Sequence, residues 1–211
     1  MYATVTDLRE EGVNEAMASD ARLCSLLHEA GAIIDRTTGW FFEPRSLTLT
    51  LDGRGHPTLE TPVPLIRLDR LMVGGQSLST TLDELLILGA PVGPGFSGPF
   101  LVRLDGTPFP RGRGNVVAEG LWGFTEPNTL PEGGTPLEIR RACLLLVLRL
   151  LHPMAGDEAA EAKNRWRVLE ERTRDQSYKL APLQLPGPFT GDWEIDGILL
   201  RYRRPLGMGG V

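Results

Sequence analysis

SLTLTL, residues 46–51, is the stretch that decides the fold, because apolar and polar side chains alternate strictly along it. A period of two is typical of a half-buried β-strand. The turn sequence DGRG follows at residues 52–55, and residues 58–59 are expected to begin a return strand that completes a hairpin. A β block therefore starts near residue 45.

This β block is expected to continue to about residue 124. Further short strands are predicted at residues 65–73, 85–88, 100–104 and 115–124, with Pro- and Gly-rich loops between them. Short strands joined by such loops are typical of a small antiparallel barrel or sandwich.

Helical periodicity flanks the β block on both sides. A short Thr-capped helix is predicted over residues 6–13, and a second, capped by Ser19 or Asp20, ends at Gly39. The apolar face of the second helix repeats at spacings of three and four, with Leu23, Leu26, Leu27, Ala30, Ile33 and Ile34.

Three more helices are predicted after the β block. Residues 137–152 form a strongly apolar core helix ended by Pro153, residues 157–174 a long charged helix, and residues 192–202 a short final helix. The expected fold class is α+β: a helical bundle of long helices with an inserted small antiparallel β barrel or sandwich and an extended C-terminal tail. The expected domains are the N-terminal helices of the bundle at 1–44, the β domain at 45–125, the C-terminal helices at 126–202 and the tail at 203–211.

Composition agrees with a globular chain of 211 residues, 41% hydrophobic and 23% charged. The longest apolar stretch, residues 142–151, is interrupted by Arg149 and is about half of what a bilayer requires. We therefore expect no transmembrane helix, and the N-terminus lacks the features of a signal peptide. Cys24 and Cys143 both lie in helical patterns and are expected to be free structural cysteines.

Charge is mildly acidic and uneven. The formal net charge is −5, with −7 carried by residues 1–136 and +2 by residues 137–211. This negative net charge argues against a protein that binds nucleic acid over a broad surface. The loop RGRG at residues 111–114 is interpreted as a solvated turn, with a contact to phosphates as the alternative.

Motifs for catalysis or cofactor binding are missing from the sequence. His28, His56 and His152 lie on three separate elements without a partner at ligand spacing. GPGFSG, residues 93–98, spells a dinucleotide-binding motif, but Pro99 and a predicted strand follow where that motif needs a helix. It is interpreted as a hairpin loop, and we expect no catalytic residue, no metal and no cofactor.

The C-terminal segment carries the clearest candidate for binding. Its predicted helix begins with acidic residues and ends with basic ones, and a Gly-rich tail follows. One interpretation is a frayed terminus; the other is a peptide that orders against a protein partner. The candidate contact residues are Arg201, Tyr202, Arg203, Arg204, Pro205, Leu206, Met208 and Val211.

Several segments resemble one family in the same order along the chain, namely residues 2–12, 32–45, 122–124, 136–142 and 190–199. This family is the head–tail connector, or adaptor, proteins of tailed bacteriophages and related prophages. Its shorter members are almost wholly helical, so the β block departs from them and resembles the larger members that carry an insertion.

The resemblance implies a structural virion protein at the head–tail interface, made in the host cytoplasm, and not an enzyme. It implies a homo-oligomeric ring, commonly a dodecamer, beneath the portal protein ring, with a tail-proximal stopper or tail-terminator protein below. The C-terminal segment would reach the portal, and genomic double-stranded DNA would pass through the lumen without sequence-specific binding. The negative net charge suits such a channel, because Arg clusters in the lumen would retain phosphates.

Two other classes remain open from the sequence. A DNA-binding assembly factor would use the Arg-rich final third of the chain, and salt-sensitive retention on duplex DNA would reveal it. An enzyme with an unrecognised carboxylate site in the β domain would reveal itself by turnover that a Glu or Asp substitution abolishes.

Overall fold

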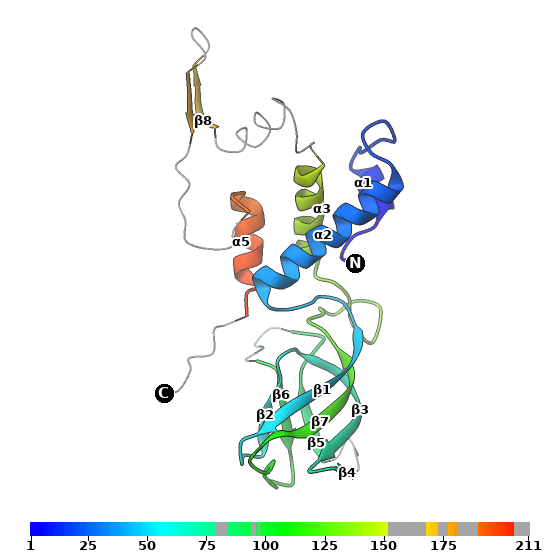
Figure 1. The fold of residues 1–211 in the computed structure, drawn as a ribbon, viewed down its shortest axis with the longest axis vertical. Helices are drawn as coiled ribbons and strands as arrows, with labels where there is room; N and C mark the ends of the chain where they lie inside the picture. The colour runs from blue at the N-terminus through cyan, green and yellow to red at the C-terminus, as the bar shows by residue number, and fades with distance from the viewer. Residues whose placement is uncertain are drawn as a thin grey trace. The chain divides into compact units, whose positions relative to one another are not determined.

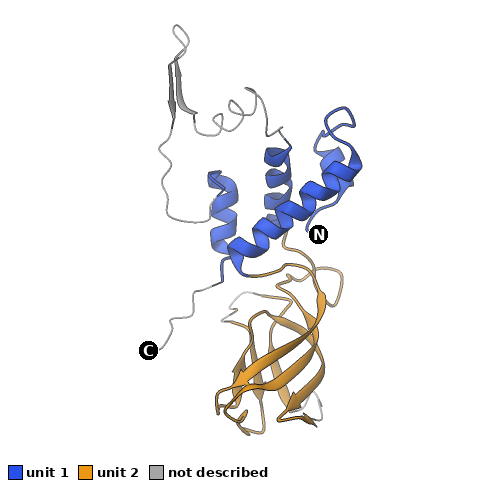
Figure 2. Cartoon of the chain, in the orientation of Figure 1, with its two compact units in different colours: residues 1–39, 138–211 blue, residues 40–137 orange. Residues whose placement is uncertain are grey.

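Two compact units make up the chain in the computed structural model, which describes residues 1–78, 84–93, 96, 98–151, 168–172, 177–180 and 190–204. The helical unit consists of Met1–Gly39 and Glu138–Val211, and the β unit of Trp40–Leu137, shown in blue and orange in Figure 2. The helices are α1 (Val5–Glu10), α2 (Asp20–Thr38), α3 (Leu137–Leu150) and α5 (Trp193–Arg201) (Figure 1).

Helix α2 confirms its prediction. Ser19 caps its N-terminus, and Gly39 ends it in the left-handed conformation with φ of 75°, which glycine adopts without steric cost. Of its predicted apolar face, Leu23, Leu26, Leu27, Ala30 and Ile34 are buried, and Ile33 is half-buried. The cap of α1, however, is Thr4 and not Thr6, because the Thr4 hydroxyl accepts the Asp7 amide N–H while the Asp7 carboxylate accepts that of Thr4.

The expected bundle of long helices is wrong. The four helices of the described residues are short: α1 has 6 residues, α5 has 9 and α3 has 14, and α2 is the longest with 19. The helix predicted over residues 157–174 is contradicted at its end, where β8 (Val168–Arg172) pairs with β9 (Ser177–Leu180). Backbone pairing with a neighbouring strand overrides the helix propensity of Leu, Glu and Arg there. The rest of that predicted helix lies outside the described residues.

Among the described residues of the β unit, seven strands form two antiparallel sheets. One sheet has the order β1-β7-β3-β4 and the other β2-β6-β5. No closed barrel forms among the described strands, because no pairing joins one sheet to the other. The strands are β1 (Arg45–Gly53), β2 (Thr58–Glu60), β3 (Leu65–Val73), β4 (Gln76–Leu78), β5 (Leu85–Leu88), β6 (Phe100–Arg103) and β7 (Gly112–Trp122).

The alternating stretch at residues 46–51 is a strand, but its predicted partner is wrong. β1 pairs with β7, while β2, the expected return strand, pairs with β6. The indole Nε1–H of Trp122 donates to the carbonyl of Leu47 at 3.0 Å, which adds a side-chain tie to the β1–β7 ladder. Both sheets contribute to one core of Leu51, Leu59, Leu65, Leu71, Leu85, Leu101, Phe109, Val116, Ala118 and Trp122.

The chain enters and leaves the β unit at neighbouring points. The hydroxyl of Thr135, just before the exit, donates to the carbonyl of Phe42, just after the entry, at 2.8 Å. The β unit is therefore an insertion whose two ends are tied to each other. Among the residues that the structure describes, no helix combines the length and apolar character needed to cross a bilayer.

Candidate functional site: two faces of the helical unit

Helix α5 is fixed firmly at its start. The Asp192 carboxylate accepts the amide N–H groups of Glu194 at 2.9 Å and Ile195 at 3.2 Å, which satisfies two of the free donors of the first turn. The amide and hydroxyl of Thr190 donate to Asp196 Oδ1 at 2.8 and 2.7 Å. These bonds hold α5 although it is only two and a half turns long.

Ion pairs align α5 antiparallel to α3. Arg141 pairs with Glu194 at the start of α5 at 2.6 Å, and Arg201 at its end pairs with Glu138. Inside this frame, Ile195, Ile198 and Leu199 form the buried face of α5. On its other side α3 is tied to α1, because Arg140 pairs with Asp7 at 2.5 Å. Helix α3 therefore lies between α1 and α5 (Figure 1).

The predicted C-terminal binding residues divide into two groups. Arg201, Tyr202, Arg203 and Arg204 are described, and the last three continue the hydrogen bonding beyond α5: the Tyr202 amide donates to Ile198, that of Arg203 to Leu200, and that of Arg204 to Thr38 at 2.7 Å. The chain is thus held on the end of α2 as far as Arg204. Pro205, Leu206, Met208 and Val211 lie outside the described residues, so the contact of this segment with a portal stays a prediction.

An exposed apolar stripe runs along the face of α5 opposite to its buried one. Trp193 is 87% exposed and Leu200 is 50% exposed. Between them, Gly197 has open space where a Cβ would stand. The spacing of four and then three residues places all three on one face. We did not predict this stripe, although the helical period alone separates Trp193 from the buried set of Ile195, Ile198 and Leu199.

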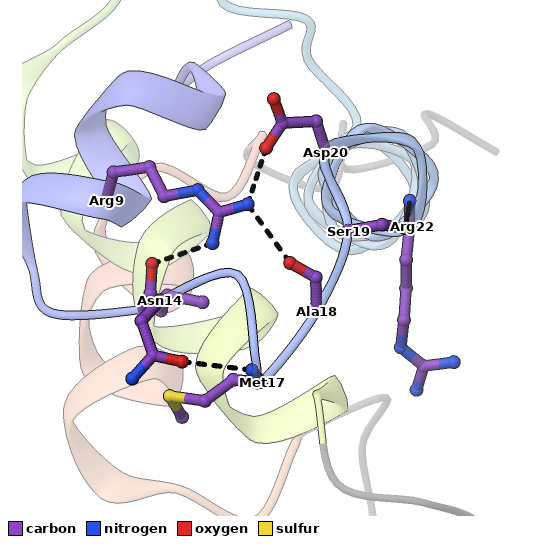
Figure 3. A network of polar contacts seen from close by, with 8 residues as sticks. Arg9, Asn14, Met17, Ala18, Ser19, Asp20 and Arg22 are labelled. Atoms are coloured by element: carbon purple, nitrogen blue, oxygen red, sulfur yellow. Dashed lines mark hydrogen bonds and ion pairs between the residues drawn. The ribbon is translucent and has the colours of Figure 1, made fainter.

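A second feature is an open hollow of about 590 Å³ beside the loop between α1 and α2, lined by Arg9, Gly12, Val13, Asn14, Glu15 and Asp20. Arg9 organises it (Figure 3), since its guanidinium donates to the carbonyls of Val13 at 2.8 Å and Ala18 at 3.0 Å and pairs with Asp20 at 2.5 Å. The Asn14 side chain accepts the Met17 amide N–H at 3.0 Å. No sequence signal pointed to this site, because its residues meet only in the folded loop.

Two titratable groups of the helical unit, Cys143 and Asp7, have shifted pKa values. Burial raises the pKa of the Cys143 thiol to about 12, so it stays protonated and unreactive at neutral pH. Burial alone would raise the pKa of Asp7, but the bonds from Thr4 and Arg140 outweigh it and lower that pKa below its usual value. Both groups sit where α1 meets α3.

The other candidates from the sequence do not converge on a site. His28 and His56 are exposed and lie in different units, and His152 lies outside the described residues. Within the described part of the chain, no group of three or more His, Cys, Asp or Glu side chains is placed to hold a metal ion. The motif at residues 93–98 lies between β5 and β6, which pair as a hairpin, so the helix that a dinucleotide site requires is replaced by a strand.

The fold defines a class: an α+β chain in which a small helical unit carries an inserted β unit, with an exposed apolar stripe on α5. No family model and no curated protein sequence matches the chain. Solved structures do share its fold.

A chain in the neck of an empty gene transfer agent (GTA) particle, solved with C6 symmetry, aligns at a TM-score of 0.60 and 17% identity, covering 98% of this chain and 91% of that one. A chain in the neck of the native GTA particle, solved with C12 symmetry, aligns at 0.56 and 16%, with the same coverage. A chain of the native GTA virion aligns at 0.51 and 18%, covering 92% of this chain and 82% of that one. This chain therefore has the fold of those neck and virion chains.

Proposed function

We propose that this protein is a structural component of the neck of a phage-like particle, a head–tail connector that assembles as a ring beneath the portal. The observation that carries the proposal is the fold likeness across 98% of the chain, which includes both the helices and the inserted β unit. A likeness to one helix pair or one sheet would carry far less, because small motifs recur in many unrelated functions.

Three further features support this role. The helical unit has an exposed apolar stripe on α5, which suits packing between subunits. Its net charge of −5 suits a channel that double-stranded DNA crosses without being held. The similar neck structures were solved with sixfold and twelvefold symmetry, which agrees with a homo-oligomeric ring such as a dodecamer.

The position of this ring is the finer part of the proposal. The ring lies in the virion at the head–tail interface, with the portal ring on one side and a tail-proximal stopper or tail-terminator protein on the other. The C-terminal segment is the anchor on the portal, and its residues after Arg204 follow the last backbone bond that holds the chain on α2.

The test is co-sedimentation of the purified protein with the portal ring of the same particle, for the full chain and for a chain ending at Arg204. This truncation keeps the Arg204 bond to Thr38, so α5 stays closed on α2. We expect the full chain to bind and the truncated chain to bind at least tenfold more weakly. Equal binding of both would overturn the anchor assignment alone, whereas no binding by either would overturn the connector proposal.

Particles that lack this protein give an independent test. We expect DNA-filled heads without tails, because the component that connects the head to the tail would be absent. Normal tailed particles would contradict the proposed role.

A further inference from the structure

The exposed stripe of α5, defined by Trp193, Gly197 and Leu200, is the feature of the helical unit that the fold itself does not explain. Neither Trp193 nor Leu200 contributes to the core, and the open space at Gly197 leaves the middle of the stripe uncovered. A Trp side chain buries about 150–250 Å² when covered, and Trp is enriched among the residues that dominate binding energy. An exposed Trp on a fixed helix therefore indicates a protein contact.

The hollow beside the α1–α2 loop has the chemistry to receive such a side chain. Arg9 is held by acceptors on Val13, Ala18 and Asp20, so its planar guanidinium is already ordered. A guanidinium whose N–H groups are used in this way still stacks through its faces on an aromatic ring. Met17, 54% exposed in the same loop, adds a thioether suited to an aromatic contact.

The hollow and the chain that follows α5 lie at opposite ends of α2. The hollow includes Asp20, the first residue of α2, whereas the chain after α5 is bonded to Thr38, the last. An α-helix of 19 residues is about 28 Å long at 1.5 Å per residue. Figure 1 shows α1 and α5 on opposite sides of α3, so one copy cannot fill its own hollow with its own stripe.

Charge on the two features is complementary. Around the hollow, Glu11 and Glu15 are exposed acidic side chains. Just beyond the stripe, Arg203 is an exposed basic side chain. Opposite charges at the rim of an apolar contact steer two surfaces together and fix their orientation.

We propose that the α5 stripe of one copy packs on the α1–α2 loop of the next copy, with the Trp193 indole in the hollow against Arg9. Such a contact joins two different faces of the same chain, so it is head-to-tail, and repetition by rotation closes it into a ring. The inference rests on the proposed ring and names the faces that build it.

The first test compares the substitutions Trp193→Ala and Leu104→Ala in the full chain. Leu104 is an exposed apolar side chain in the β unit, outside the proposed contact, and serves as the control. Because both side chains are exposed, both variants are expected to keep the wild-type circular dichroism. We expect Trp193→Ala to raise the protein concentration required for ring formation, alone or on the portal, by at least tenfold, and Leu104→Ala to leave it unchanged.

The second test is a disulfide between copies in a Cys24→Ser background. Copies carrying Trp193→Cys are mixed with copies carrying Glu15→Cys, and the control mixture pairs Trp193→Cys with His28→Cys, an exposed position on α2. We expect cross-linked dimers in the first mixture and not in the control.

Each outcome decides between the proposals. Wild-type rings from Trp193→Ala together with no cross-link at Glu15 overturn the inference and leave the neck function standing. Cross-linking at His28 in place of Glu15 also overturns it. If Trp193→Ala blocks portal binding while free rings persist, the stripe contacts the portal, and the copy-to-copy contact is wrong. If the wild-type chain forms no ring alone or on the portal, the proposed function fails, and the inference with it.

Discussion

Arg9 joins three parts of the helical unit through one side chain. Its guanidinium reaches the loop at Val13 and Ala18 and the start of α2 at Asp20, while its own backbone belongs to α1. The guanidinium of Arg presents several N–H donors in a planar fork, which makes this geometry possible. The compact ammonium group of Lys does not reproduce it. Arg9 is only 23% exposed, so solvent screens these bonds less than those of a free surface side chain.

Replacement of Arg9 tests this role. We expect Arg9→Ala to lower the free energy of unfolding by about 2 kcal/mol, because two buried carbonyls lose a charged donor, and Arg9→Lys by about 1 kcal/mol. Asp20→Asn is the matched control and is expected to cost less than about 1 kcal/mol, because the Asp20 side chain is 72% exposed. Urea unfolding followed by circular dichroism measures all three. An Asp20→Asn effect as large as that of Arg9→Ala would show that the ion pair, and not the loop bonds, carries the stability.

Cys143 gives a prediction on reactivity. Because burial raises its pKa to about 12, the thiol is protonated in the folded protein at neutral and mildly alkaline pH. We expect N-ethylmaleimide at pH 8 to label Cys24, which is partly exposed, and to leave Cys143 unmodified until the protein is unfolded in urea. Peptide mass spectrometry distinguishes the two sites. Rapid labelling of Cys143 in the native protein would show that α1 opens away from α3.

At the scale of elements, local sequence patterns predicted the helices and strands that local interactions determine. The helix α2 and the strands β1 and β3 follow from periodicity, caps and flanking Pro and Gly, and all three lie close to their expected bounds. Strand partners did not follow, because the paired residues of β1 and β7 lie 59 to 77 positions apart in the sequence and their register is set by the shared core. The wrong prediction at β8 has the same cause, because its pairing with β9 makes that segment a strand and not a helix.

The candidate site was predictable only in part. The helix after residue 192 and its terminal charges are visible in the sequence. The helical period of the sequence also places Trp193 on the outward face, although we did not predict this. The hollow was not predictable, because it depends on how the turn after α1 brings Arg9 to Asp20. No repeated spacing or motif marks such a loop.

The N-cap of α5 supports the element that carries the exposed stripe. We expect Asp192→Ala to destabilise the helical unit by about 1–2 kcal/mol, since two amide N–H groups of the first turn lose their acceptor, while Asp192→Ser is expected to restore most of the loss. Chemical unfolding measures the free energies. Hydrogen exchange at Glu194 and Ile195 reports the cap directly, and unchanged exchange in Asp192→Ala would contradict this assignment.

On the scale of the whole molecule, each unit has a buried set of its own. The buried core cluster of the β unit runs from Leu51 to Trp122, with Phe41 and Leu49 packed against it, and the bond from Thr135 to Phe42 closes the two ends of the unit. The helical unit buries its own set on α1, α2, α3 and α5. Each unit has the anatomy of a domain that folds on its own.

Expression of residues 40–137 alone tests this independence. We expect a monomeric, folded β domain with cooperative thermal unfolding, because its core needs no side chain from the helices. Thr135→Val is expected to lower its stability by about 1 kcal/mol through loss of the bond to Phe42. Dispersed amide signals in NMR spectra would establish the fold, and an unfolded fragment would show that the helical unit is required.

The paired ends of the β unit also have a consequence for protein engineering. A guest module whose termini lie equally close to each other fits between Gly39 and Glu138 without changing the separation of the helices that precede and follow it. A closed ring of such chimeras would present its cargo at fixed angular intervals, so enzymes or fluorophores grafted at this junction would be spaced by the symmetry of the assembly and not by the length of a flexible tether.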